Sequence, residues 1–358
     1  MTIVTTPRRK CKLATPPLAV LYALVILSEM LAADGAVNSA RISHGALREL
    51  DNSPSIHFAA LGDWGAHPTS LRRRNGQLAV ADGVASWLDK ISDENHEVGD
   101  ESAPFILSLG DNFYPAGVND LDDMTERFAD TFEEVYSHDA FDNVPWYAIA
   151  GNRDHIGNVT AQMNFPGSSR WIFPDHFHRV VREVRIPGGN VDRDTMKVEI
   201  LAIDSIQLAD SSDISLEVTT RSTQWIQHHL QHSDADYLIV AGHYPARMTT
   251  ILDELLPDHR VSAYVNGHDH CQKHEIKNGV DHFISGAGME VNSLNHEECL
   301  HDTVDDNNYL GGFLSFHARV DKMVVVFHDE TGTELQSVEV APRNTNKHVG
   351  LEGSIEIA

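Results

Sequence analysis

Short apolar runs rich in β-branched and aromatic residues recur along the chain, and this composition is typical of buried strands. They lie at residues 57–61, 105–109, 146–150, 198–203, 237–241, 263–265 and 282–285. Apolar residues at helical spacing fill several of the intervals, at 77–91, 124–135 and 223–230. Near the C-terminus, three consecutive strand-like runs follow at 313–320, 323–328 and 334–340, joined at Asp321-Lys322 and around Gly332. The pattern predicts an α/β fold in which two mixed β-sheets form a sandwich flanked by helices.

The N-terminal segment has the three parts of an export signal. Basic residues between 8 and 12 precede an apolar run at 18–27, and small residues follow from 32 to 40. The apolar run is shorter than the roughly 20 residues that span a bilayer, which favours a cleaved signal over a retained anchor. We therefore predict a signal peptide at 1–36, a polar segment at 37–54, one folded domain at 55–342 and a tail at 343–358. The predicted destination is the secretory route, leading outside the cell or to a lysosome or vacuole.

The chain of 358 residues is acidic, with 27 Lys and Arg against 53 Asp and Glu and a formal net charge of −26. Such a charge excludes a sequence-independent hold on nucleic-acid phosphates. If the substrate is an anion, a local cation must offset the repulsion, and bound metal ions would do so.

Two cysteines, Cys271 and Cys299, lie beyond the predicted signal peptide. Their spacing is compatible with a disulfide and equally with two buried thiols. Asn158-Val159-Thr160 is an N-glycosylation sequon, which fits an exported protein.

Five of the strand-like runs are followed by a glycine and a polar residue able to bind a metal. The pairs are Gly62-Asp63, Gly110-Asp111, Gly151-Asn152, Gly242-His243 and Gly267-His268. A glycine after a strand permits a sharp turn, so that the next side chain points over the carboxyl ends of the strands, where α/β sheets bind ligands. We therefore expect these side chains to converge on one site.

Each of these residues alone is typical of a turn or of a hydrogen-bonded histidine. Together with Tyr114 and His270 they form a set of two carboxylates, one amide, three imidazoles and one phenol. Carboxylate and phenolate suit a trivalent ion, whereas imidazole and amide suit a divalent ion such as zinc, iron or manganese. The set predicts a pair of metal ions of unequal charge.

With these motifs, the sequence resembles the purple acid phosphatases, especially the small tartrate-resistant type within the calcineurin-like metallophosphoesterases. The resemblance runs from about residue 56 to 342 and is carried by five blocks in order. They are Gly62-Asp63-Trp64-Gly65, Gly110-Asp111-Asn112-Phe113-Tyr114, Gly151-Asn152-Arg153-Asp154-His155, Gly242-His243-Tyr244-Pro245 and Gly267-His268-Asp269-His270. Tyr114 separates this family from most metallophosphoesterases.

The resemblance implies how the seven ligands are divided between the two ions. Asp63, Tyr114 and His270 would bind Fe(III), while Asn152, His243 and His268 would bind the divalent ion and Asp111 would bridge the two. It also implies a reaction in which hydroxide formed on the metal pair attacks a phosphate monoester, releasing the alcohol and inorganic phosphate.

The chain departs from the family pattern at two positions around this site. Arg153 stands where the family has a histidine that binds phosphate or protonates the leaving group, and arginine cannot donate that proton. The loop after Pro245 looks shortened and lacks a second histidine. We therefore predict that Arg153 contacts phosphate and that substrates with good leaving groups are preferred. His155 is a candidate for part of the proton-donor role, and the alternative is a position at a helix start or on the surface.

The sequence thus predicts an acid phosphatase acting on phosphate monoesters of small molecules or phosphoproteins, with anhydrides as a further candidate substrate class. It predicts no nucleic-acid partner, no stable membrane association after signal removal, and an N-glycan at Asn158. One alternative is a secreted protein of the same fold that binds metal or phosphate with weak or lost turnover. Another is an iron pair that generates reactive oxygen species.

Overall fold

The computed structural model describes residues 54–94, 103–163, 165–190, 193–210, 214–291, 299–300 and 311–343. All of these fall within one compact unit, Ser53–Ala358. The predicted signal peptide and nearly all of the polar segment and tail lie outside the described residues, so those boundaries stay predictions. Within the described ranges, no helix combines the length and the apolar character needed to cross a membrane.

The first sheet has seven strands in the order β13-β12-β11-β1-β2-β3-β4. Their bounds are β1 Ile56–Leu61, β2 Phe105–Ser108, β3 Trp146–Ala148, β4 Trp171–Ile172, β11 Gly312–Ala318, β12 Met323–Asp329 and β13 Glu334–Val340. Strands β1 to β4 run parallel, and the C-terminal strands β11 to β13 extend the sheet by antiparallel pairing. The expected C-terminal meander is confirmed.

The second sheet has six strands in the order β5-β6-β7-β8-β10-β9. They are β5 Phe177–Asn190, β6 Arg193–Ile203, β7 Tyr237–Ala241, β8 Ala263–Asn266, β9 Gln272–Lys277 and β10 Val280–Ser285. Strands β6, β7, β8 and β10 run parallel, while β5 and β9 pair antiparallel at the two edges. Both sheets are therefore mixed, as expected.

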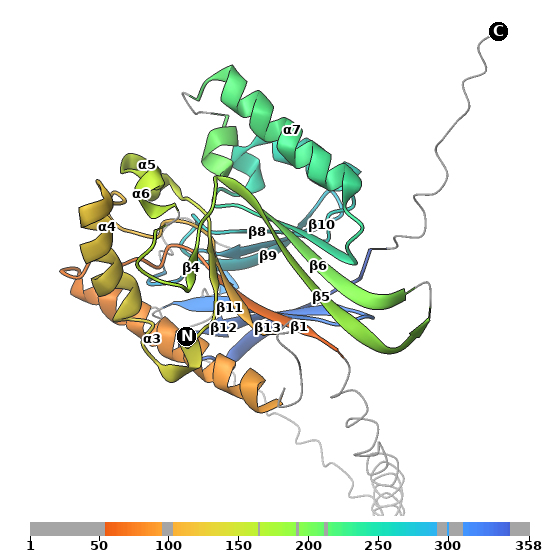
Figure 1. The fold of residues 1–358 in the computed structure, drawn as a ribbon, viewed down its shortest axis with the longest axis horizontal. Coiled ribbons are helices and arrows are strands. Elements are labelled where there is room, and N and C mark those ends of the chain that lie inside the picture. Colours follow the sequence, from red (N-terminus) through yellow and green to blue (C-terminus); the bar gives the residue numbers. More distant parts are fainter. Residues whose placement is uncertain are drawn as a thin grey trace, which may run out of the picture. The chain divides into compact units, whose positions relative to one another are not determined.

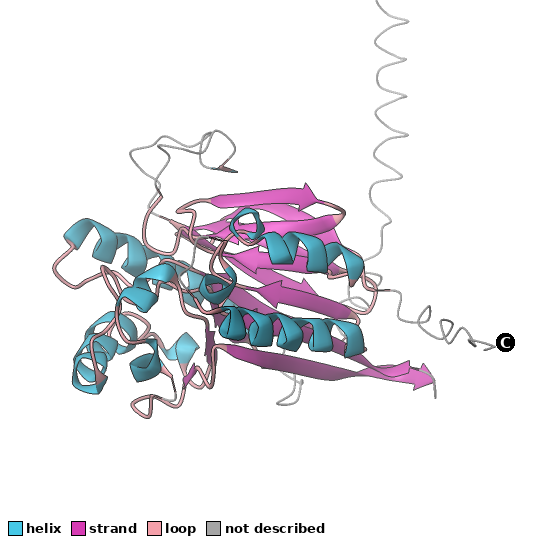
Figure 2. Ribbon diagram, turned by 90° about the horizontal axis from the view of Figure 1, so that it is seen from above, coloured by secondary structure: helices cyan, strands magenta, loops and turns pink. Residues whose placement is uncertain are grey.

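The two sheets pack face to face around one apolar layer and are covered by helices on their outer faces (Figure 1). Helices α3 (Leu71–Glu94) and α4 (Leu121–Phe128) pack on the first sheet, and α7 (Leu216–His232) and α8 (Thr250–Asp258) pack on the second. Figure 2 shows the same layers from above. The predicted fold, two mixed sheets flanked by helices, is confirmed.

Several elements differ from the sequence prediction because local composition hides them. The strand β5 begins Phe-His-Arg and carries charged residues on its exposed face, since it is an edge strand of the second sheet. The segment 124–135 is not one α-helix: α4 ends at Phe128 and a π-helical turn, Ala129–Glu133, follows. After Pro245, a 3₁₀ turn at Ala246–Met248 leads directly into α8, which the sequence analysis treated as a loop.

The two cysteines outside the predicted signal peptide form a disulfide. Cys271 and Cys299 have Cα atoms 5.9 Å apart, within the range that a disulfide bridges. Of the two alternatives left open by the spacing, the bridge is the one found. Because Cys271 follows His270 directly, this crosslink ties the end of the fifth motif to a segment 28 residues further along the chain.

Candidate metal centre

The five motifs meet because they follow strands whose carboxyl ends point to the same side of the sandwich. Strands β1, β2 and β3 are parallel neighbours in the first sheet, and β7 and β8 are parallel neighbours in the second. A hydrogen bond from the Asp63 amide to the Gly110 carbonyl (2.9 Å) joins two motifs. Another, from the Gly242 amide to the Val265 carbonyl (3.0 Å), joins the fourth motif to β8, two residues before the fifth motif begins. The expected convergence at the strand ends is confirmed.

The backbone at three of the motifs is held in the left-handed region that only glycine adopts easily. Asp63, Asp111 and His268 have φ angles of 58°, 54° and 70°. Non-glycine residues in this region are uncommon and cluster at functional sites. The motif glycine instead allows neighbouring backbones to lie close together. A Cβ on Gly151, for example, would lie 2.2 Å from the Asp111 amide nitrogen. The motif glycines do not make the turns as expected, since of these five glycines only Gly110 (φ 91°) has positive φ.

Asp63, Tyr114 and His270 form the first group of donor atoms. The Tyr114 hydroxyl lies 2.9 Å from Asp63 Oδ1 and 2.9 Å from His270 Nε2, and the latter two atoms are 3.4 Å apart. Separations of about 3 Å are those of atoms that each lie roughly 2.0–2.2 Å from a common ion. Asp63 is fully buried and Tyr114 is almost so.

Asn152, His243 and His268 form the second group. Asn152 Oδ1 lies 3.0 Å from His243 Nε2 and 3.0 Å from His268 Nδ1. The other ring nitrogen of His243, Nδ1, donates to the Leu109 carbonyl at 2.9 Å, so Nε2 faces the site and is the atom that can bind a metal ion once it is deprotonated. This is the arrangement that a metal-binding imidazole requires.

Asp111 lies between the two groups. Its Oδ1 atom is 3.4 Å from His243 Nε2 and accepts a hydrogen bond from the Arg153 backbone amide at 2.7 Å. Donor atoms of Asp63, Asp111 and His243 all lie within 4.8 Å of one another. The Asp111 carboxylate is therefore close enough to both groups of donor atoms to bridge two metal ions.

Burial and the neighbouring imidazole rings shift the pKa values of the two carboxylates of the centre in opposite directions. Burial raises the pKa of Asp111 to about 6, with the negative charges of Asp63 and Asp154 adding to the effect. Burial alone would also raise the pKa of Asp63, but the positive charge of His243 and the hydrogen bond from His270 outweigh it and lower that pKa to about 2. Buried carboxylates beside inward-facing imidazoles fit cations, which would satisfy both.

A second layer of side chains, which the sequence analysis missed, orients the first. His270 Nδ1 faces Glu290 Oε1 at 3.3 Å, and Glu290 pairs with Arg73 at 2.7 Å. The Arg73 and Arg153 guanidinium groups lie 5.3 Å and 5.7 Å from the Tyr114 ring centre. Neither Arg73 nor Glu290 lies in a recognisable motif, so only their position in the fold identifies them.

Asp154 holds the loops after β2 and β3 together. Its fully buried carboxylate accepts hydrogen bonds from the backbone amides of Asn112 (3.1 Å) and Gly151 (2.8 Å) and from the Gln162 side chain (3.0 Å). These bonds fix the backbone next to Asp111 and next to Asn152. Asp154 therefore positions the centre without facing it.

His155 lies on the short helix α5 (Asn152–Ile156) and is hydrogen-bonded to a buried carboxylate. Its Nε2 lies 2.8 Å from Asp204 Oδ2, and the same oxygen is 2.6 Å from His176 Nδ1. These distances are shorter than the 2.9–3.4 Å separations of the two donor groups above and match charge-assisted hydrogen bonds. His155, Asp204 and His176 form a hydrogen-bonded relay. No sequence motif predicted it.

The loop after Pro245, which lacks the second histidine of the family pattern, carries Arg247. Arg247 contacts both carboxylate oxygens of Asp269, at 2.9 and 2.7 Å. Asp269 lies between His268 and His270, so the contact anchors the fifth motif to the 3₁₀ turn at Ala246–Met248. The loop after Pro245 is therefore held against the fifth motif by this ion pair.

Comparison with known proteins places the chain in a family. A model of the calcineurin-like phosphoesterases matches residues 56–272. Tartrate-resistant acid phosphatase type 5 of Oryctolagus cuniculus is 34% identical over 319 residues, which cover 81% of this chain and 92% of that protein. Purple acid phosphatase 7 of Arabidopsis thaliana is 25% identical, covering 86% and 92%.

A solved structure shares the fold. GAP50, described as the anchor in the inner membrane complex of Plasmodium, superposes with a TM-score of 0.65 at 22% identity, covering 81% of this chain and 89% of that one. The chain belongs to the calcineurin-like phosphoesterases and, within them, to the purple acid phosphatases of the tartrate-resistant type, hydrolases whose relationship implies a dinuclear metal centre.

Proposed function

We propose that the protein is an acid phosphatase that hydrolyses phosphate monoesters, and activated anhydrides, at an Fe(III) and divalent-metal pair. The observation that supports this most directly is the convergence of all seven sequence-predicted ligands at one edge of the sandwich: Asp63, Asp111, Tyr114, Asn152, His243, His268 and His270. The proposed ligand division is Asp63, Tyr114 and His270 for iron, Asn152, His243 and His268 for the divalent ion, and Asp111 between them.

The metal pair, when bound, supplies Lewis acidity that activates water and neutralises phosphate charge. The side chains around it orient the substrate and the ligands. The Arg153 side chain is exposed, and its guanidinium lies near the Tyr114 ring, where its fork can hold two phosphate oxygens. His155, one helical turn after Asn152, is placed on the same face of α5 and can give a proton to the leaving alcohol.

The iron assignment is tested by colour. We expect the purified protein to absorb green light and to contain about one iron and one further metal ion per chain, because a phenolate bound to Fe(III) is coloured. Tyr114→Phe should abolish the band. Tyr244→Phe is the matched control, since Tyr244 packs 4.6 Å from His268 without belonging to the iron group, and it should keep the band. A colourless wild-type protein without iron would contradict the assignment.

The substitution at Arg153 predicts a leaving-group preference. Because arginine cannot donate a proton, we expect alkyl phosphates, whose alcohols leave poorly, to be hydrolysed much more slowly than aryl phosphates. Arg153→His should raise kcat on an alkyl phosphate by about tenfold relative to an aryl phosphate. Arg153→Gln, which removes the charge without adding a proton donor, should raise KM and leave the alkyl-to-aryl ratio unchanged. An unchanged ratio in Arg153→His would refute this role.

The absence of the family histidine at Arg153 also motivates a second candidate, a protein that binds metal or phosphate with little turnover. An assay of the purified protein with an activated aryl phosphate at acid pH separates the two. Turnover supports the phosphatase, whereas tight phosphate binding without turnover supports the binding protein.

We further propose that the protein follows the secretory route and carries an N-glycan at Asn158. Asn158 is exposed and caps the short helix α6 (Val159–Gln162) by accepting a hydrogen bond from the Ala161 amide at 3.2 Å through Oδ1. That bond leaves Nδ2, the atom to which a glycan attaches, turned away from the cap. A mass shift on enzymatic deglycosylation that is absent in Asn158→Gln tests this.

A further inference from the structure

A hollow of about 410 Å³ opens between α3 and the strands β1, β11, β12 and β13 of the first sheet. Among its lining residues, His57 lies near the amino end of β1, six residues before Asp63. At about 3.3 Å per strand residue, the hollow is roughly 20 Å from the metal centre. It is therefore separate from the site described above.

Three cationic side chains and one carboxylate, Glu334, line this hollow in a protein whose net charge is −26. Lys90 on α3 is exposed and makes no hydrogen bond or ion pair with any described residue. Arg319 uses Nε to donate to His317 Nε2 at 3.0 Å, which leaves the two terminal nitrogens of its fork free of partners in the described part of the chain. Lys322 pairs with Glu339. Local positive charge in an acidic protein favours an anionic ligand.

A buried imidazole in the same wall has an unused hydrogen-bonding atom. His57 is 4% exposed, its ring stacks on that of His317 with centroids 4.2 Å apart, and its Nε2 lies 2.8 Å from the Ser55 hydroxyl. Its Nδ1 has no partner among the described residues. Burial lowers the pKa of His57 to about 3, with the positive charges of His317 and Arg319 adding to the effect, so the ring stays neutral.

The role of His57 Nδ1 depends on the tautomer of the ring. Where the Ser55 hydroxyl donates to Nε2, Nδ1 carries the hydrogen and is a donor without a partner among the described residues, and in the other tautomer Nδ1 is an acceptor. Buried polar atoms without partners are rare and call for an explanation such as a ligand. His57 and the Arg319 and Lys90 cations line the same hollow.

We propose that this hollow binds a small organic anion bearing a phosphate or sulfate group. Arg319 and Lys90 hold the charged group, and His57 donates to it from Nδ1 in the tautomer in which Ser55 donates to Nε2. The Trp87 ring with Val324 and Val326 forms an apolar wall for the organic part. The hollow is of the size that small-molecule sites usually have. A phosphorylated ligand and a sulfated ligand share this chemistry and are compared in the experiment below.

Isothermal titration of the metal-loaded protein with glucose 6-sulfate and with a non-hydrolysable phosphonate analogue of glucose 6-phosphate tests the proposal. We expect about one equivalent of the sulfate ester to bind outside the metal centre, and Arg319→Gln to weaken it at least tenfold, because a charged hydrogen bond is lost. Lys90→Gln, an exposed change that breaks no contact with a described residue, should weaken it several-fold. If the phosphonate binds there too, it should show a second equivalent, which Arg319→Gln and Lys90→Gln weaken by the same factors.

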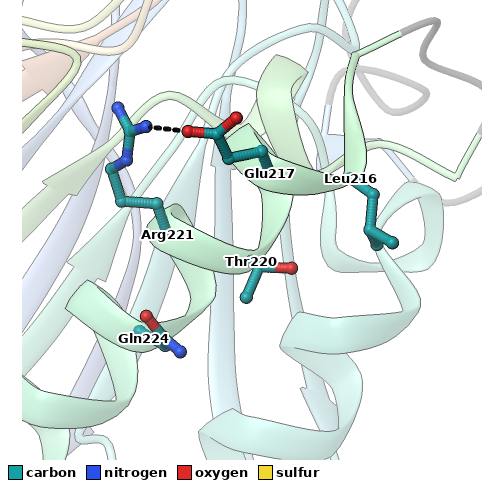
Figure 3. A pocket seen from close by; sticks show the side chains of 5 residues that line it. All are labelled: Leu216, Glu217, Thr220, Arg221 and Gln224. Carbon is teal, nitrogen blue, oxygen red and sulfur yellow. Dashed lines mark hydrogen bonds and ion pairs between the residues drawn. The ribbon is translucent and has the colours of Figure 1, made fainter.

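The matched control is Arg221→Gln. Arg221 is equally cationic but lies in an open hollow formed by one face of α7 alone, where it pairs with Glu217 at 2.8 Å (Figure 3). This change should leave binding unaltered. The sulfate ester should also not compete with an aryl phosphate substrate. The proposal is overturned if no binding is seen, if Arg319→Gln and Lys90→Gln bind as tightly as wild type, or if binding is competitive with substrate.

Discussion

Asp111→Asn is expected to lower kcat/KM for an aryl phosphate by at least about 1,000-fold, because the charge between two cations supports several kcal/mol of transition-state stabilisation. The change is conservative in shape. An asparagine oxygen can still accept the hydrogen bond that Asp111 Oδ1 takes from the Arg153 amide, so the backbone has no reason to move. Metal content measured by mass spectrometry should fall together with activity.

Asp269→Asn is the control for the Asp111 variant. Asp269 is a carboxylate of the same neighbourhood, but its oxygens bind Arg247 and not the donor groups. We expect it to change kcat/KM by less than about tenfold, since it removes one partly exposed ion pair. Near-wild-type turnover and full metal content in Asp111→Asn would show that Asp111 does not hold the metal pair.

Much of the fold followed from the sequence because most strands are buried on both faces and read as continuous apolar runs. The run at 237–241 coincides with β7 and the run at 105–109 contains β2, and every residue of both strands is buried. The edge strands β5 and β9 escaped prediction because half of their residues face solvent and carry charge. Apolar patterning reports burial, and an edge strand has less of it.

The donor groups were predictable for a different reason. Each ligand follows a strand end in a short motif, so the sequence itself marks where the chain turns toward the site. The side chains that orient the ligands carry no such mark. Glu290 reaches His270 across the fold, and Asp204 reaches His155 from the end of β6, so both become visible only once the sheets are assembled.

His155→Gln is expected to lower kcat on an alkyl phosphate by about 100-fold and on an aryl phosphate by less than about tenfold, because only the alkoxide needs a proton as it leaves. Glutamine keeps a hydrogen-bond donor for Asp204 but cannot release a proton at acid pH. Initial rates with one alkyl and one aryl ester give the two factors. Equal losses on both substrates would show that His155 only supports the structure. His228→Asn, on α7, is the control and should change neither rate.

Asp204 should set the pH range over which this proton donor works. Burial alone would lower the pKa of His155, but the hydrogen bond and the negative charge of Asp204 outweigh it and raise that pKa above its ordinary value. A donor acts while protonated, so activity on alkyl phosphates is lost as pH rises through the pKa of His155, and a raised pKa extends activity to higher pH.

Asp204→Asn should therefore move the alkaline loss of alkyl activity to lower pH. The aryl rate of this variant reports whether the fold and the metal centre survive the change at a fully buried position. A retained aryl rate with an unshifted alkyl profile would exclude the relay. A shifted profile would mean that His155, kept protonated by Asp204, supplies the proton that the family histidine supplies from the position of Arg153. Arg153 could then bind phosphate while His155 protonates the leaving alcohol.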